Sequence, residues 1–228
     1  MSEVRRVVLV GGHGKIALLA APKLAERGFA VDSLIRNPEH SGEISQIGAT
    51  PVVLDIENAD VDQLAEAFRG AHAVVFSAGA GGGNPQRTRA VDFEAAARSM
   101  EAAERAGVSR YVMVSYSRAL VDVENLDPED SFYTYAKAKH DADAVLRGTG
   151  LDYTILGPGV LTLEPASRQI LIADGAGNID GKSPSPQTGK VSRENVAEVI
   201  AHVVDARAAV RATVNFYDGR TPIAEAIR

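Results

Sequence analysis

The feature that most constrains the fold is a regular alternation of short apolar runs with longer segments of helical pattern. Apolar runs occupy residues 5–11, 30–36, 50–55, 72–78, 110–116 and 151–157. Helical patterns separate them at 15–28, 38–48, 60–70, 88–107 and 133–150. The cores VVLV, AVVF and YVMV are apolar at every position, which is typical of strands buried on both faces of a parallel sheet. The sequence therefore predicts an α/β fold with a doubly wound parallel sheet, the Rossmann fold.

This regular order ends at Pro158. Glycines and prolines interrupt the segment 173–189, a helix fits 193–208, and a short strand fits 212–219. No linker-like composition separates this tail from the rest of the chain. We therefore predict one domain over residues 1–228, in which 158–228 contain a small irregular C-terminal lid on the substrate side.

Composition limits what the chain can bind. It has 228 residues, a formal net charge of −6 and no cysteine. The lack of thiols excludes disulfides, thiolate catalysis and cysteine zinc sites. The five histidines show no metal-binding spacing, so we predict no metal site. Lysines and arginines are scattered along the sequence, and we therefore expect no nucleic-acid partner.

The sequence also predicts where the protein works. No apolar run approaches the roughly 20 residues that a membrane helix needs. The apolar run behind Arg5 and Arg6 is too short for a signal peptide. We expect a cytoplasmic protein with a small-molecule substrate and no membrane contact. It would be a monomer or a homodimer; the helix predicted at 88–107 offers a dimer face, although packing on the sheet also accounts for its apolar stripe.

Three glycines join the first predicted strand to the first helix in VVLVGGHGKIALLAA, residues 7–21. Gly12, Gly14 and Ala17 fit the spacing G-x-G-x-x-A, whereas Gly11, Gly14 and Ala17 fit G-x-x-G-x-x-A. In either spacing the glycines let the backbone approach a pyrophosphate, and the helix N-terminus offers free N–H donors. The place in the first βα unit favours a dinucleotide site over a plain turn. The candidate contacts are Gly11, Gly12, His13, Gly14, Lys15 and Ile16.

Arg36, at the end of the second predicted strand, indicates which dinucleotide is bound. NAD-binding proteins usually place Asp or Glu there to hold the ribose hydroxyls, whereas Arg accommodates a 2′-phosphate. Asp32 lies four residues earlier, within the strand, and is a poor candidate for the ribose contact. The planar fork of Arg suits phosphate, and Lys15 or His13 would add positive potential. The sequence therefore favours NADP over NAD.

Taken together, the segments GGHGKIA, IRNPEH, VVLDIENADVDQLAEAFRGAHAVVFSAG, RYVMVS and LDYTILGPGVLT resemble the atypical short-chain dehydrogenase/reductases. The similarity is to the NAD(P)-binding branch of NmrA-like and flavin-reductase-like proteins, and it runs from about residue 5 to 205. It implies adenine contacts from Asp55 and Ile56. It implies further cofactor contacts, from the adenine ribose to the nicotinamide, by Ser77, Ala78, Gly79, Ser115, Tyr116, Pro158, Gly159 and Val160.

The resemblance also implies a catalytic Ser, Tyr and Lys, with Tyr and Lys spaced Y-x-x-x-K on a helix. Residues four apart share one helical face, so Lys can orient the nicotinamide ribose and lower the pKa of the phenol. The family pattern selects Tyr135 and Lys139, and the register of Tyr133 and Lys137 is the alternative. For the serine we favour Ser115, with Ser117 as the alternative.

One departure bears on function. The family usually has Arg before Pro-Gly in the sixth strand, whereas Gly157 stands here. The predicted activity is an NADP-dependent oxidoreductase that passes hydride between the nicotinamide and a small carbonyl, quinone or flavin-like substrate. The alternatives are a non-catalytic NADP(H)-sensing regulator of NmrA-like type and an NAD-dependent epimerase/dehydratase-like enzyme.

Two loops, one rich in glycine and one acidic, are weaker candidates for site residues. The glycine loop Gly81–Gly83 would lie over the crevice, as a phosphate or lid contact or as loose surface. Asp127, Glu129 and Asp130 are interpreted as solvated charges rather than an acid/base pair.

Overall fold

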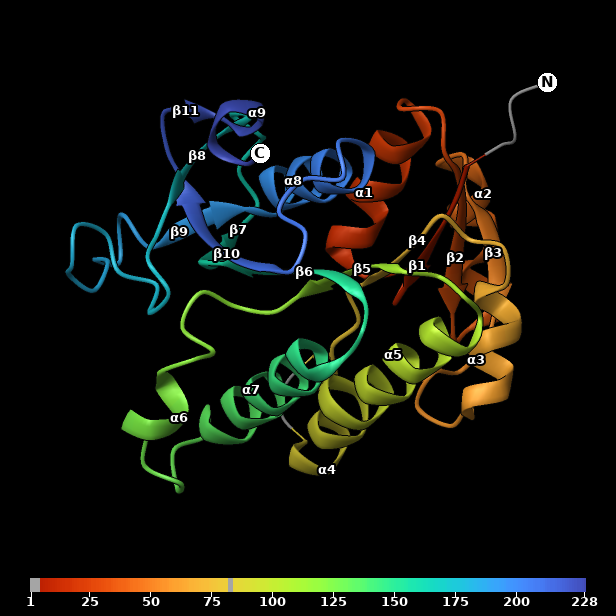
Figure 1. The fold of residues 1–228 in the computed structure, drawn as a ribbon, viewed down its shortest axis with the longest axis horizontal. Helices are drawn as coiled ribbons and strands as arrows, with labels where there is room; N and C mark the ends of the chain where they lie inside the picture. Colours follow the sequence, from red (N-terminus) through yellow and green to blue (C-terminus); the bar gives the residue numbers. More distant parts are fainter. Residues whose placement is uncertain (1–4, 82–83) are drawn as a thin grey trace.

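Residues 5–81 and 84–228 are described by the computed structural model, in which a nine-stranded sheet is covered by helices on both faces (Figure 1). The strand order is β11-β8-β10-β6-β5-β4-β1-β2-β3. The seven strands from β10 to β3 run parallel to one another, whereas β8 runs antiparallel to both β10 and β11. The parallel strands are β1 (Arg6–Val10), β2 (Ala30–Ile35), β3 (Thr50–Val53), β4 (Ala73–Phe76), β5 (Arg110–Val114), β6 (Asp152–Pro158) and β10 (Ala212–Asp218).

Helices form a layer on each side of the sheet. On one face lie α1 (Lys15–Ala25), α2 (Ser41–Gln46) and α8 (Arg193–Asp205), which share one apolar core. On the other face lie α3 (Val61–Phe68), α5 (Ala96–Arg105) and α7 (Tyr133–Gly148), which share the second core. Figure 1 shows α1 and α8 above the sheet and α5 and α7 below it. The predicted α/β fold with a doubly wound parallel sheet is thus confirmed.

The apolar strands explain this layering. In β1, Val7 and Leu9 enter one core while Val8 and Val10 enter the other, and all four are fully buried. Successive side chains of a strand point to opposite faces, so a strand covered on both sides must be apolar throughout.

The C-terminal segment extends the sheet. The strand predicted at 212–219 is β10, which pairs in parallel with β6. Beside it lie β8 (Gln169–Ile172) and β11 (Thr221–Pro222). A separate small sheet joins β7 (Val160–Thr162) to β9 (Lys190–Ser192). The strands β8 and β11 escaped the sequence pattern because most of their side chains are exposed; in β8, Ile170 is buried and its three strand neighbours are not. The strands β7 and β9 have only three residues each, too few to show a period.

The remaining elements are short. The predicted helix at 88–107 consists of α4 (Pro85–Thr88), a π-helical segment η2 (Arg89–Ala95) and α5. The polar loop predicted at 118–131 contains one helical turn, α6 (Asp122–Asn125). A 3-10 turn, η1 (Pro38–His40), precedes α2, and α9 (Ile223–Ala226) ends the fold.

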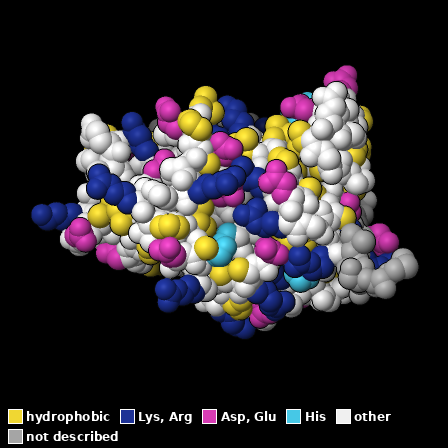
Figure 2. Space-filling model, turned by 90° about the horizontal axis from the view of Figure 1, so that it is seen from above, with side chains coloured by type: hydrophobic (Ala, Val, Ile, Leu, Met, Phe, Trp, Pro, Cys, Tyr) yellow, Lys and Arg dark blue, Asp and Glu magenta, His cyan; other side chains and the backbone are white. Residues whose placement is uncertain are grey.

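Two surface observations bear on partners. Figure 2 shows basic and acidic side chains interspersed over the face seen from above. Among the described residues, no helix is both long enough and apolar enough to cross a bilayer.

Candidate functional site

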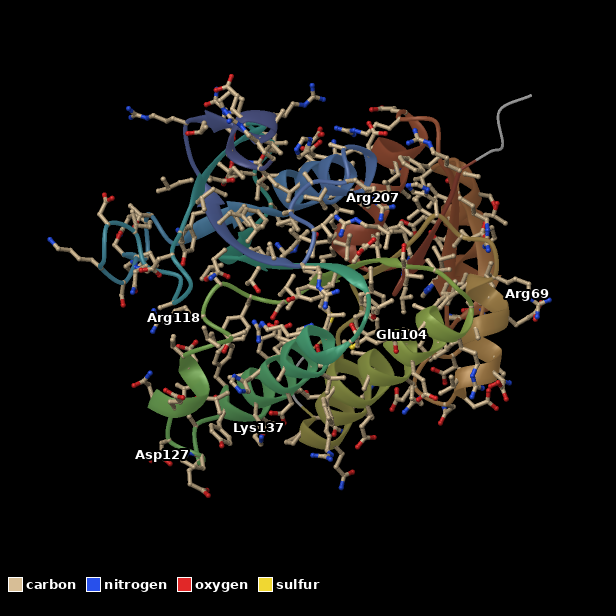
Figure 3. The ribbon with its side chains drawn as sticks, viewed as in Figure 1. Arg69, Glu104, Arg118, Asp127, Lys137 and Arg207 are labelled. Atoms are coloured by element: carbon tan, nitrogen blue, oxygen red, sulfur yellow. The ribbon has the colours of Figure 1, made fainter. Side chains whose placement is uncertain are left out.

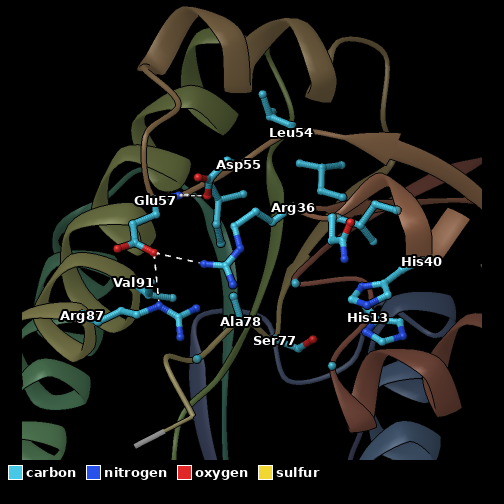
Figure 4. Close-up of a pocket in the computed structure, with 17 residues that line it drawn as sticks. His13, Arg36, His40, Leu54, Asp55, Glu57, Ser77, Ala78, Arg87 and Val91 are labelled. Atoms are coloured by element: carbon cyan, nitrogen blue, oxygen red, sulfur yellow. Dashed lines mark hydrogen bonds and ion pairs between the residues drawn. The ribbon is translucent and has the colours of Figure 1, made fainter. Parts of the chain in front are cut away.

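Two cavities lie along the carboxyl edge of the parallel strands, where ligands bind in sheets of this kind. The first has a volume of about 320 Å³ and is lined by residues that follow β1, β2, β3 and β4 (Figure 4). The second, of about 530 Å³, is lined by residues that follow β5 and β6 and by the C-terminal segment. The predicted site residues in the first cavity are Gly11, His13, Gly14, Arg36, Asp55, Ile56, Ser77, Ala78 and Gly79. Those in the second are Ser115, Tyr116, Tyr135, Pro158, Gly159 and Val160.

The glycine turn forms one wall of the first cavity. Gly11 has a φ of +80°, and a Cβ there would meet Ala78 Cα at 2.6 Å. A Cβ on Gly12 would meet Ser33 Cβ at 2.5 Å. Both glycines are therefore required, Gly11 by its backbone conformation and Gly12 by its packing against β2. They serve different purposes, so the structure uses the glycines of both candidate spacings.

The start of α1 is suited to an anion. Gly14 is its N-cap residue and supplies no side chain to the free N–H groups, and no acid lies in the first turn. Gly14 lines the cavity, so these donors and the positive end of the helix dipole are available to a phosphate. Three predicted contacts do not line the cavity: Gly12 and Ile16 are buried behind the turn, and Lys15 is exposed.

Arg36 extends from the end of β2 into the first cavity, with 57% of its side chain exposed. Its Nη1 lies 3.6 Å from Oε2 of Glu57, and Nε of Arg87 lies 3.3 Å from the same oxygen. Figure 4 shows Glu57 between the two arginines. Arg87 and Glu57 escaped the sequence reasoning because they belong to α4 and the loop after β3, far from Arg36 in sequence. Asp32 instead pairs with Arg6, with 2.5 Å between Oδ2 and Nη1.

Other polar groups of the first cavity differ in how they are held. Asp55 accepts hydrogen bonds from the backbone N–H of Glu57 (3.1 Å) and from Asn58 Nδ2 (2.7 Å), so its carboxylate shapes the loop. The Oγ of Ser77 is buried and has no hydrogen-bond partner among the residues described. An unpartnered buried hydroxyl is costly unless a ligand satisfies it. The cradle of glycines, the uncapped helix and this hydroxyl together fit a dinucleotide.

A pair of histidines borders the glycine turn. The rings of His13 and His40 stack with centroids 3.6 Å apart. His13 Nε2 lies 2.7 Å from Oε2 of Glu43. The stack fixes the turn between β1 and α1 against the segment after β2.

The second cavity is mostly apolar and aromatic. Tyr116, Phe132 and Tyr135 contact one another with ring centroids 5.3 to 5.6 Å apart. The buried hydroxyl of Tyr116 has no hydrogen-bond partner in the described part of the chain. Burial, reinforced by the nearby Asp122 carboxylate, raises the pKa of Tyr116, so this hydroxyl stays protonated and can donate to a ligand.

Arg118 stands at the side of the second cavity near the loop that follows β8 (Figure 3). Its Nε donates to Asp122 Oδ1 at 2.9 Å. Its Nη1 lies 3.4 Å from Ala176 O and from Ser183 Oγ. Because Asp122 neutralises the guanidinium, Arg118 adds little net charge to the cavity wall.

Lys139 is buried beneath the second cavity. Its Nζ donates to the backbone oxygen of Val114 at 3.0 Å and lies 3.3 Å from Oδ1 of Asp92. Burial lowers the pKa of Lys139, but Tyr135, Asp92 and Asp143 together raise it above its ordinary value. The pKa of Tyr135 is also raised: burial raises it, Lys139 lowers it, and the two carboxylates raise it again. The carboxylates thus offset the lowering that a lysine alone would cause.

The alternative pair lies elsewhere. Tyr133 and Lys137 line a separate small cleft with Arg89 and Phe93, and Lys137 pairs with Asp141. Both candidate serines line the second cavity. Ser117 Oγ lies 3.0 Å from Tyr217 Oη, which donates its one proton to the backbone oxygen of Gly177 at 2.6 Å. The catalytic roles of Tyr135, Lys139 and Ser115, and the nicotinamide ribose contact of Lys139, remain predictions.

Two buried acids were missed by the sequence reasoning. Asp92, from η2, accepts a hydrogen bond from the backbone N–H of Ala80 at 2.9 Å. Asp143, from α7, accepts one from Ser115 Oγ at 2.7 Å. Each is about 1% exposed. The helical spacing of Asp143 from Lys139 was a usable signal, since residues four apart share a face; Asp92 had none.

Gly157 has a steric explanation. Its Cβ position is occupied by the amide of Asn215, and Ser117 Cα would lie only 3.2 Å away. Asn215 in turn donates to the backbone oxygens of Asp174 and Gly175 at 2.9 and 3.2 Å. An Arg at position 157 would displace this bridge to the C-terminal segment.

The weaker candidates lie at the periphery. Gly81 precedes the cavity-side helix α4, and Gly82 and Gly83 lie outside the described residues. Asp127, Glu129 and Asp130 are exposed, and Figure 3 shows Asp127 at the outer edge of the molecule. Within residues 5–81 and 84–228, His, Asp and Glu side chains form no cluster of three or more suited to a metal ion.

Known proteins resemble this chain over nearly its full length. A family model described as NAD(P)H-binding matches residues 11–207. A Bacillus subtilis protein named uncharacterized sugar epimerase YhfK is 31% identical over 225 residues, which cover 98% of this chain and 99% of the relative. The structure of a putative NAD-dependent epimerase/dehydratase from Bacillus halodurans superposes with a TM-score of 0.85 at 31% identity, covering 97% of this chain and 98% of that one. The oxidoreductase YlbE from Lactococcus lactis superposes with a TM-score of 0.79 at 27% identity, covering 97% and 94%.

Proposed function

Since the chain belongs to the NAD(P)H-binding family, as an atypical short-chain dehydrogenase/reductase, we propose that it is an NADP-dependent oxidoreductase. It would transfer hydride between the nicotinamide and a small carbonyl, quinone or flavin-like substrate. When bound, NADP supplies the hydride chemistry, and the protein supplies orientation and electrostatics.

The observation that carries the NADP assignment is Arg36 at the end of β2, in the first cavity. β2 ends without an acid there, and Asp32 is engaged with Arg6. Oε2 of Glu57 lies 3.6 Å from Nη1 of Arg36 and partly neutralises it. Because this ion pair is exposed to solvent, separating it costs little free energy. A 2′-phosphate would receive two hydrogen bonds from the guanidinium fork, and Arg87 stands beside it as a second cation.

The aromatic cavity supports hydride transfer to an apolar acceptor. Its wall holds the hydroxyls of Tyr116 and Tyr135, each able to donate a hydrogen bond to a substrate oxygen, and that of Ser115, which donates to Asp143. The raised pKa of Tyr135 keeps its phenol protonated at neutral pH, as a proton donor requires. Lys139 would position the end of β5 through its hydrogen bond to the backbone oxygen of Val114.

A second candidate is an NAD-dependent epimerase/dehydratase-like enzyme. The carboxylate of Glu57 lies in the first cavity and would accept hydrogen bonds from the ribose hydroxyls of NAD. The names of the Bacillus subtilis and Bacillus halodurans relatives favour the same class. In that case the cofactor would be regenerated in each cycle rather than consumed.

Calorimetric titration with NADP⁺ and NAD⁺ tests the cofactor. Arg36→Ala should weaken NADP⁺ binding roughly tenfold or more and leave NAD⁺ binding nearly unchanged. Arg89→Ala is the matched control, because Arg89 is exposed, pairs with Glu94 and lies outside the first cavity. Equal weakening of both cofactors, or of neither, would refute the NADP assignment.

Turnover is tested by NADPH consumption with quinones, flavins, aldehydes and nitroaromatics, using Tyr135→Phe and Lys139→Ala as controls. Stoichiometric NADPH oxidation that falls in both variants supports the oxidoreductase. Tight NADP(H) binding without turnover would instead identify the NADP(H)-sensing regulator of NmrA-like type. Sugar epimerisation with no net cofactor consumption would identify the epimerase.

A further inference from the structure

A buried carboxylate lies directly behind the wall of the second cavity. Asp143 projects from α7 and is about 1% exposed. Its Oδ2 lies 2.7 Å from Oγ of Ser115. Its Oδ1 finds no hydrogen-bond partner among the described residues. A half-satisfied carboxylate is costly at such a depth, which makes its protonated form accessible.

Ser115 connects this carboxylate to the cavity. It lines the cavity, is 4% exposed, and its backbone N–H donates to Leu156 O at 2.8 Å. The residue is therefore fixed at the end of β5, and only the direction of its hydroxyl proton is free. A serine hydroxyl has one proton to donate and can accept two hydrogen bonds.

The two forms of Asp143 direct that proton oppositely. An ionised carboxylate can only accept, so it accepts the hydrogen bond from Ser115, and the Ser115 oxygen then faces the cavity only as an acceptor. A protonated Asp143 donates to Ser115 Oγ across the same 2.7 Å, which frees the Ser115 proton for an oxygen in the cavity.

We propose that Asp143 is a positioning residue that sets the direction of the Ser115 hydroxyl, so that Ser115 donates a hydrogen bond to the substrate oxygen only while Asp143 is protonated. The inference rests on the proposed oxidoreductase function, in which that oxygen gains negative charge as hydride arrives. A hydroxyl donor stabilises such charge, and an acceptor facing it repels it. No proton leaves Ser115 in this role.

Burial, partly offset by nearby positive charges, places the titration of Asp143 near pH 6. Burial raises the pKa of Asp143 to about 6, although the Ser115 hydrogen bond and nearby Lys139, Arg147 and His140 lower it. The titratable or charged groups that act with Asp143 are Tyr135, Lys139, His140 and Arg147 of α7, Tyr116 after β5, and Asp92 of η2, which pairs with Lys139. Both forms of Asp143 are therefore populated between about pH 5 and 7.

The coupling is tested without substrate or cofactor by a carboxyl ¹³C NMR titration of protein labelled at aspartate. One resonance should titrate near pH 6 and be missing from Asp143→Asn. It should persist in Asp141→Asn, the matched control on the same helix, which pairs with Lys137 at the surface. In Ser115→Ala the same resonance should titrate at higher pH, because the hydrogen bond from Ser115 stabilises the ionised carboxylate and the variant lacks it. An unchanged titration in Ser115→Ala would overturn the proposal even if Asp143→Asn failed to fold.

Kinetics with NADPH and the best acceptor of the panel test the consequence. Wild-type kcat/KM should fall about tenfold per pH unit above the pKa of Asp143. The profile of Asp143→Asn should be flat over that range, and His140→Gln should keep the wild-type fall, since histidines also titrate near neutral pH. A fall retained in Asp143→Asn, or a wild-type profile that rises, would overturn the inference and leave the oxidoreductase intact. If the panel gave no turnover, the proposed function would fail, and the NMR titration would decide the coupling alone.

Discussion

Asp92 and Lys139 form a fully buried ion pair that links the two cavities. Their Oδ1 and Nζ atoms lie 3.3 Å apart, with 1% and 4% of the side chains exposed. Asp92 also accepts a hydrogen bond from the backbone N–H of Ala80, next to the first cavity. Lys139 donates one to the backbone oxygen of Val114, at the edge of the second cavity. Asp92 belongs to the π-helical segment η2, and such segments occur frequently at functional sites.

Removing one partner of this pair should be strongly destabilising. Asp92→Ala leaves the Lys139 ammonium buried and unpaired, and we expect the free energy of unfolding in urea to fall by about 3 kcal/mol. The double variant Asp92→Leu with Lys139→Met should lose less than Asp92→Ala, because it leaves no buried charge. Equal losses in the two variants would contradict a buried ion pair.

Gly11 and Gly28 separate backbone strain from steric overlap. Their φ values are +80° and +81°, but no described atom lies within 4 Å of a Cβ placed on Gly28, whereas Ala78 blocks one on Gly11. Gly28→Ala should cost about 1 kcal/mol of stability from backbone strain alone. Gly11→Ala should cost roughly 3 kcal/mol and also weaken NADP⁺ binding. Thermal unfolding and calorimetric titration measure the two effects, and equal costs would refute the overlap.

Glu57 should oppose phosphate binding at Arg36. Its carboxylate neutralises both Arg36 and Arg87, so Glu57→Gln should tighten NADP⁺ binding roughly two- to fivefold, the range that exposed charge pairs contribute. The gain should shrink at high salt. Glu66→Gln, which removes a surface acid paired with Arg69, is the control. Weaker NADP⁺ binding in Glu57→Gln would show instead that Glu57 holds the arginines in place.

Tyr116→Phe tests whether the unpartnered hydroxyl serves a ligand. Because that hydroxyl makes no hydrogen bond within the described structure, its removal should leave stability unchanged or raise it by up to about 1 kcal/mol. If the hydroxyl donates to substrate, KM should rise in the same variant. A stability loss above about 1 kcal/mol would mean that the hydroxyl is satisfied within the protein.

The local parts of the site were predictable from the sequence. The glycine turn, Arg36 and the strand ends follow from signals that lie within one βα unit or at a fixed distance from it. The apolar strands predicted the parallel sheet, because burial on both faces leaves no room for alternation. Spacing placed Tyr135 and Lys139 on one helix face, but Tyr133 and Lys137 have the same spacing, and the family resemblance selected between the two pairs.

Contacts between distant segments were not predictable. The position of Glu57 between Arg36 and Arg87, and of Asp92 beside Lys139, depends on how helices and loops that are far apart in the sequence pack together. The strands β8 and β11 carry mostly exposed side chains, so pairing with β10 rather than periodicity defines them.

By itself, the sequence determined the sheet and the glycine turn, and it named the candidate phosphate contact, because each depends on residues close together in the chain. Only the tertiary structure decided that Ser115 meets Asp143 and that Gly157 must be glycine beside Asn215. Those properties arise from side chains brought together by packing, and burial then changes the pKa of Asp143 in a way that no local pattern records.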